Sequence, residues 1–182
     1  MSHFGVAVEY ALHIMTQLAR FTPDKPPSAK ALAEFQGIPP TYLAKIMTLL
    51  NKAGLVEASE GKGGGYRLAR APQTITFLHV VDAIEGRKSL FECTEVRQRC
   101  VLYGGQAPGT VTAKVCAIHA VMLAAERGMR EQLAAVTVAD ISRPLAANTS
   151  PETRERALQW FADHAVKPLK QMKAHREATP RK

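Results

Sequence analysis

The chain has 182 residues, 46% of them hydrophobic, which allows one ordinary domain or a small domain with an appendage. Its formal charge is +8 at pH 7, and the surplus lies in residues 1–75 and 151–182. Such a surplus suggests an anionic partner such as nucleic acid. Residues 1–9 show no secretory signal and no run of 18 apolar residues occurs, so we expect a cytoplasmic protein with no membrane partner.

Apolar residues at three- and four-residue spacing predict a first helix over residues 4–21. Prolines at 23, 26 and 27 end this helix. The Ser28 hydroxyl is expected to cap a short second helix over residues 29–35, which Gly37 ends in a left-handed conformation.

A third helix is predicted over residues 41–53, opened by two prolines and closed by Gly54, and its core-facing residues are expected to be Leu43, Ile46, Leu49 and Leu50. Two short strands follow at 55–59 and 66–69, separated by a segment with four glycines that permits close backbone approach. These elements predict a winged helix-turn-helix whose third helix enters the major groove of DNA.

Thr76 is expected to cap a helix over residues 77–85, and residues 87–112 form a long irregular stretch. Residues 113–134 then read as a helix longer than the small N-terminal domain needs to cover its core, which favours a dimer interface. After Ile141 the chain is expected to loosen, before a basic amphipathic helix over residues 151–175 that we expect to be solvated.

The predicted fold is mainly α-helical with a small β-hairpin wing. Its expected parts are a DNA-binding domain (1–86), a loop (87–112), a dimerisation helix region (113–141) and a basic extension (142–182).

Three cysteines, Cys93, Cys100 and Cys116, all fall within 24 residues of this chain. An odd number argues against a disulfide framework, and the clustering favours a metal or redox site over unrelated core positions.

Several motifs in order closely resemble the IscR/NsrR family (the Rrf-two family) of winged-helix regulators: EYALH (9–13), GIPPTYLAK (37–45), AGLV (53–56) and GKGGGY (61–66). The resemblance covers about residues 4–141. It implies a homodimeric transcription regulator, expected to be a repressor, that reads a palindromic operator in double-stranded DNA. No catalytic motif supports an enzyme.

The segment ECTEVRQRC (92–100) resembles the cluster loop of the redox-sensing branch of this family, and CAIH (116–119) resembles the segment with its last cysteine. The resemblance implies an iron–sulfur cluster on Cys93, Cys100 and Cys116. The fourth ligand implied is either His119 or Glu9 of the partner subunit, and we favour a two-iron over a four-iron cluster. His13 is a candidate neighbour of Glu9.

Two features depart from the family pattern. The third cysteine lies sixteen residues after the second, several more than in the best-known members, and Gln36 stands where some relatives have a histidine ligand. Zinc held by three cysteines and a histidine, and direct oxidation of bare thiols, are the alternative chemistries. A cluster-free regulator that senses through its thiols or a small ligand is therefore the alternative function.

Candidate DNA contacts lie on the third helix and on the wing. On the helix, Lys45 can pair with phosphate or guanine, and the hydroxyls of Thr41, Tyr42 and Thr48 with phosphate or base edges. Tyr42 is equally compatible with packing on the first helix. On the wing the candidates are Lys62, Gly64, Tyr66 and Arg67.

Overall fold

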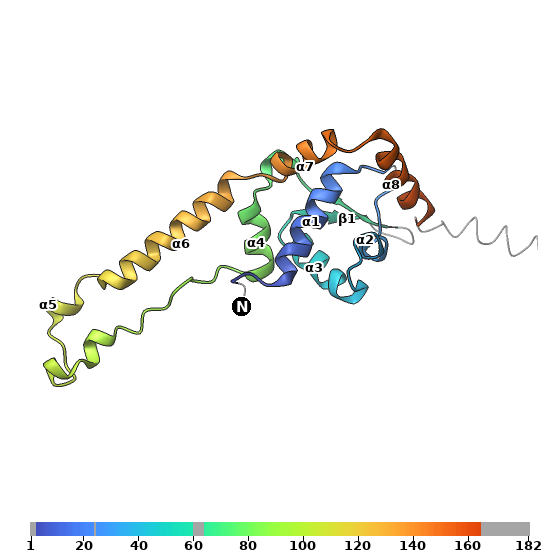
Figure 1. The fold of residues 1–182 in the computed structure, drawn as a ribbon. Helices are drawn as coiled ribbons and strands as arrows, with labels where there is room; N and C mark the ends of the chain where they lie inside the picture. The colour runs from blue at the N-terminus through green and yellow to red at the C-terminus, as the bar shows by residue number, and fades with distance from the viewer. Residues whose placement is uncertain (1–2, 24, 60–63, 165–182) are drawn as a thin grey trace, which may run out of the picture. The chain divides into compact units, whose positions relative to one another are not determined.

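A computed structural model describes residues 3–23, 25–59 and 64–164 of the chain. The chain divides into two compact units (Figure 1). The first comprises the described residues within 1–86 and 136–164, and the second comprises residues 87–135. We call these the N-terminal unit and the loop–helix unit.

The N-terminal unit begins with the three predicted helices: α1 (Val6–Arg20), α2 (Ala29–Gln36) and α3 (Pro40–Lys52). The Ser28 hydroxyl accepts a hydrogen bond from the backbone N–H of Ala31 at 3.1 Å, which confirms the predicted cap. Gly37 adopts a left-handed φ of 67° at the end of α2, also as predicted. This residue lets the chain turn between the two helices without strain on a side chain.

The apolar stripe of α3 is one residue different from the prediction. Leu43, Ile46 and Leu50 are buried, but Leu49 is 39% exposed and Met47 takes its place in the core. Spacing of three, four and seven residues from Leu43 leads to Ile46, Met47 and Leu50, whereas position 49 falls off this stripe.

The wing is a two-stranded antiparallel hairpin, β1 (Val56–Ala58) and β2 (Tyr66–Leu68), with Glu57 opposite Arg67. It packs closely on the loop before α2, because the Tyr66 backbone N–H donates to the Pro27 carbonyl at 2.9 Å. A Cβ on Gly65 would lie 2.0 Å from the Pro26 carbonyl oxygen, so this position has room only for glycine. The expected close backbone approach thus occurs within the protein itself.

A short turn, η1 (Pro72–Thr74), leads to α4 (Phe77–Glu85), where Thr76 forms the predicted cap. Contrary to the expected loosening after Ile141, residues Val138–Ala147 form α7, with Pro144 inside it, and α7 packs against α1. A capping box between Thr137 and Asp140 fixes its start. The predicted boundary at residue 142 therefore falls within a helix of the N-terminal unit.

The expectation that the C-terminal helix is only solvated is wrong. Helix α8 (Pro151–Asp163) buries Ala157 and Phe161 in the core, and Phe161 stacks on Phe35 of α2 with ring centroids 4.7 Å apart. Apolar side chains on one face of an otherwise charged helix are enough to dock it. Residues 165–175 of the predicted helix lie outside the described residues.

The loop–helix unit contains short turns followed by one long helix: η2 (Val96–Arg99), η3 (Val101–Tyr103), α5 (Gly109–Thr112) and α6 (Ala117–Ala135). Helix α6 starts four residues later than predicted, directly after Cys116. None of its residues is buried, and Ile118 and Val121 are 68% and 67% exposed. A long helix with large apolar side chains in solvent is typical of an unpaired interface.

The span Gly109–Ala135 is long and apolar enough to cross a membrane by length and composition. Its C-terminal part, however, carries Glu126, Arg127, Arg130 and Glu131. The uncharged stretch between Lys114 and Glu126 is shorter than the roughly 20 residues that a membrane helix needs.

Candidate DNA-recognition surface and cysteine loop

One face of α3 presents polar side chains to solvent. Thr41, Lys45 and Thr48 are all exposed and are spaced by four and three residues, so they share a face opposite the buried stripe. The Thr48 hydroxyl donates to the Ala44 carbonyl at 2.9 Å, which leaves its oxygen as an acceptor. The geometry suits insertion of this face into the major groove.

Tyr42 has a packing role on the same helix. Its ring meets that of Tyr10 on α1 edge to face, with centroids 5.9 Å apart, and the side chain is half-buried. This is the alternative role that the sequence left open. A DNA contact by the Tyr42 hydroxyl stays a prediction.

The wing candidates fall into different environments. Arg67 is exposed, but its Nε donates to the Glu57 carboxylate at 2.5 Å across the hairpin, so a phosphate contact would have to compete with this pair. Tyr66 is half-buried and packs on the core, and Gly64 is half-buried. Lys62 lies outside the described residues.

Arg97 organises the loop that carries the cysteines. Its guanidinium donates to both carboxylate oxygens of Glu95, at 2.5 and 2.7 Å, and to the carbonyls of Val111 and Lys114 at 2.8 and 2.9 Å. Bidentate pairing holds the guanidinium in one orientation. Arg97 thereby ties the start of the loop to the segment just before α6.

All three cysteines are free, partly exposed thiols with a link to Arg97. The Arg97 charge acts on Cys116 and Cys93, and the Cys100 backbone N–H donates to the Arg97 carbonyl at 3.3 Å. The sulfur of Cys116 accepts hydrogen bonds from the backbone N–H groups of His119 and Ile118, which lowers its pKa, and Arg97 adds to this effect. A thiol at a helix N-terminus is stabilised as the thiolate in this way.

The charges of the Glu95–Arg97 pair reinforce one another. The hydrogen bond from Arg97 lowers the pKa of the Glu95 carboxyl, and the same bond raises the pKa of the Arg97 guanidinium. Glu95 itself has a positive φ of 50°, unusual for a residue with a side chain. The sequence analysis missed both residues, since nothing in their spacing marks them apart from their place between Cys93 and Cys100.

The candidate fourth ligands lie in different units. His119 is in the first turn of α6, half-buried, with its ring 5.9 Å from that of Phe91. Glu9 is exposed in the first turn of α1, with exposed His13 one turn further along. Gln36, at the position where some relatives have a histidine ligand, forms a hydrogen bond instead: its side-chain amide donates to the Gln17 side chain at 3.2 Å.

The cysteine loop suits a metal cluster in its donor chemistry, because soft thiolates with one histidine or carboxylate are ligands that iron–sulfur clusters accept. Its geometry is less complete. Within residues 3–23, 25–59 and 64–164, no group of three or more histidine, cysteine, aspartate or glutamate side chains is arranged to hold a metal ion. A cluster would therefore require the loop to close further around the three sulfurs.

A winged helix-turn-helix with an exposed polar recognition helix and a cysteine-bearing loop defines a DNA-binding transcription regulator. The family model of Rrf2, described as an iron-dependent transcriptional regulator, matches residues 5–144. The chain therefore belongs to the Rrf2 family, whose members regulate transcription and are not enzymes.

Relatives and solved structures agree with this assignment. The chain is 30% identical to Protein rrf2 of Nitratidesulfovibrio vulgaris over 148 residues, which cover 78% of this chain and 92% of that protein. It resembles T. potens IscR with 25% identity and a TM-score of 0.59, over 82% of this chain and 93% of that one. It also resembles CymR, the global cysteine regulator of B. subtilis, with 26% identity and a TM-score of 0.55. This match covers 82% of this chain and 100% of that one.

Proposed function

We propose that this Rrf2-family regulator is a cytoplasmic repressor that senses redox state, nitric oxide or iron supply through an iron–sulfur cluster on Cys93, Cys100 and Cys116. The observation that carries the proposal is that all three cysteines belong to one loop organised by Arg97. The backbone N–H groups of His119 and Ile118, together with the Arg97 cation, favour the thiolate of Cys116, and a thiolate is the form that binds iron. The match to a family described as iron-dependent supports the same chemistry.

The cluster would supply a reversible redox change, and we propose the two-iron form. His119 can contribute the fourth ligand from the same loop–helix unit as the cysteines. Glu9 belongs to the N-terminal unit, and the family resemblance implies that an acidic ligand at this position comes from the partner subunit. In that case loss of the cluster would release one subunit's DNA-reading unit from the other subunit, as a two-state switch requires.

A homodimer on a palindromic operator is part of this proposal. The exposed apolar side chains of α6 support it, because a second copy of this helix would remove them from water. Two subunits related by a twofold axis would then present two α3 helices to two half-sites.

The second candidate is a cluster-free regulator that senses through its thiols. The lowered pKa of the Cys116 thiol favours it, because the thiolate is the form that oxidants attack. The structural resemblance to CymR, the global cysteine regulator of B. subtilis, also supports it.

The visible absorption spectrum of protein purified without oxygen separates these functions, measured with iron and sulfide content and alongside a Cys93→Ala variant. We expect visible absorption with stoichiometric iron and sulfide, lost in the variant. Protein that stays colourless and iron-free after attempted reconstitution would contradict the cluster and leave the thiol sensor. Iron-free protein that contains stoichiometric zinc would contradict both.

A further inference from the structure

Helix α8 adds a cavity to the N-terminal unit. The cavity has a volume of about 410 Å³ and lies between α8, α1 and α2. Its lining from α8 comes from Thr153, Arg156, Ala157 and Trp160, all beyond the residues that match the family model. The cavity is therefore formed jointly by α8 and by residues inside the family match.

Two buried hydrogen-bond donors belong to residues that line the cavity and have no partner among the described residues. Gln17 is only 6% exposed, and its Nε2 is unpaired although its Oε1 accepts from Gln36. The buried Nε of Arg20 is also unpaired, while another guanidinium nitrogen donates to the Thr149 hydroxyl. Buried donors without acceptors are rare in folded proteins, and a ligand or a water commonly satisfies them.

The remaining lining defines the chemistry of that acceptor. Arg20 and Arg156 are cationic, and none of the described lining residues is acidic. Three aromatic side chains, Phe21, Phe35 and Trp160, provide flat apolar walls. Two guanidinium groups and the amide donor of Gln17 suit a carboxylate, and the aromatic walls suit a planar ring.

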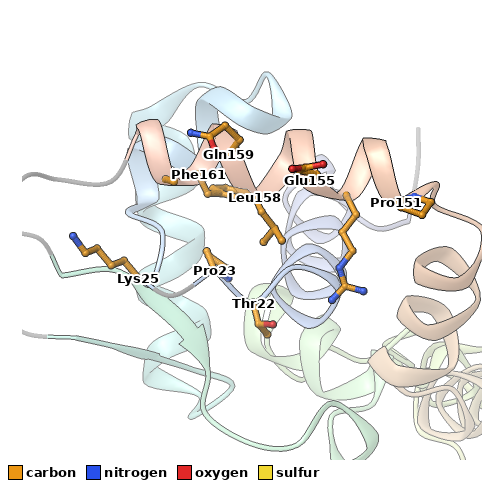
Figure 2. A pocket seen from close by; sticks show the side chains of 10 residues that line it. Thr22, Pro23, Lys25, Pro151, Glu155, Leu158, Gln159 and Phe161 are labelled. Carbon is orange, nitrogen blue, oxygen red and sulfur yellow. The ribbon is translucent and has the colours of Figure 1, made fainter.

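A neighbouring cavity of about 540 Å³ is a weaker candidate (Figure 2). Pro23, Leu158 and Phe161 give it apolar walls. Its cations, Lys25 and Arg154, share the lining with Glu155, and neither unpaired donor belongs to it. Its lining therefore selects no particular charge on a ligand.

We propose that the cavity between α1, α2 and α8 binds small aromatic carboxylates and is an effector site separate from the cysteine loop. Phe35, one of its walls, belongs to α2, the first helix of the helix-turn-helix pair. A bound ligand therefore acts on the helix that supports α3. This effect on DNA binding rests on the proposed function, whereas binding of the ligand does not.

The protein contains a single tryptophan, Trp160, and it lines the cavity, so its fluorescence reports occupancy directly. The probes are benzoate and its neutral analogue benzamide, titrated into the full chain at constant pH and ionic strength. We expect a saturable change with benzoate, with a Kd at or below about 1 mM, and at least tenfold weaker binding of benzamide. No saturable change with benzoate, or equal binding of both, would overturn the proposal.

Arg20→Lys keeps the positive charge but removes the unpaired Nε. Arg156→Gln removes the second cation, and because Arg156 is exposed this substitution should not disturb folding. Each is expected to raise the benzoate Kd about tenfold, whereas Arg154→Gln, in the neighbouring cavity, leaves it unchanged. Circular dichroism checks that each variant is folded. An equal effect of all three, or none from Arg156→Gln, would place benzoate elsewhere and overturn the assignment.

The effector role is tested by the affinity for a mixed-sequence DNA duplex at low salt, with and without saturating benzoate. A change of threefold or more supports it, and unchanged affinity despite fluorescence saturation overturns it. A protein that binds no DNA under either condition would refute the proposed function while the benzoate titration still decides the binding site.

Discussion

Arg97 shows how one side chain can determine the conformation of a loop that has little regular structure. Four of its hydrogen bonds join Glu95 to Val111 and Lys114, and its charge reaches two of the three thiols. Arg99, two residues away, makes one long hydrogen bond of 3.4 Å to Thr94. The two arginines have the same charge and lie in the same loop, but only Arg97 joins segments that are far apart in the sequence.

We therefore predict that Arg97→Gln loosens the loop and Arg99→Gln does not. Loss of the pair with Glu95 and of both carbonyl contacts should speed proteolysis between residues 95 and 114 several-fold, because local opening costs less. Limited proteolysis with mass spectrometry of the metal-free protein measures this rate. Equal cleavage of the two variants would show that Arg97 does not organise the loop.

Gly65 is a second position where one residue decides local structure. A Cβ there would lie 2.0 Å from the backbone oxygen of Pro26, which cannot rotate away. We predict that Gly65→Ala destabilises the protein by about 1–3 kcal/mol. Urea denaturation measures this loss, with Gly109→Ala as control because nothing lies within 4 Å of its Cβ position. A Gly65→Ala variant as stable as the control would mean that the hairpin shifts without cost.

At the scale of elements, α6 has no buried residue although several of its side chains are large and apolar. We predict that Ile118→Glu raises the dimer dissociation constant at least tenfold, because it places a charge in an apolar interface. Sedimentation velocity at several protein concentrations measures this dissociation constant. Ala120→Glu, two residues along and so on another face of the helix, serves as the control. If the wild-type protein is monomeric at all concentrations, the dimer proposal fails.

Helix α8 illustrates how an element can be charged overall and still belong to the core. Its sequence is rich in arginine and glutamate, and the contacts that dock it come from Ala157, Trp160 and Phe161. These contacts place aromatic rings against Phe35 of α2. The extension therefore supports the helix-turn-helix directly.

For the whole molecule, the net charge of +8 favours association with DNA through release of counterions. We predict that Lys45→Ala reduces the steepness of the salt dependence of DNA affinity by about 0.9 in the log–log plot, as expected for one lost phosphate contact. Fluorescence anisotropy at several salt concentrations measures the slope. Arg143→Ala removes the same charge from the exposed face of α7 and should leave the slope unchanged. Equal slopes for both variants would mean that α3 does not carry the contact.

The sequence by itself determined the winged helix-turn-helix, because its signals are local. Ser28, Gly37 and Thr76 act within one or two turns of the chain, and the apolar spacing of α1 and α3 needs no knowledge of the partner surface. The family motifs lie in the same region. The cysteine positions were equally visible, since clustering in sequence requires no structure.

Only the tertiary structure decided which side chains meet across long separations. It placed Arg97 against the carbonyls of residues 111 and 114, Gly65 against Pro26, and α8 against Phe35. It also kept the chain helical through Pro144, because burial of Val138 and Ala139 and the capping box outweigh one lost N–H donor. Such contacts depend on packing between distant segments, which local spacing does not encode.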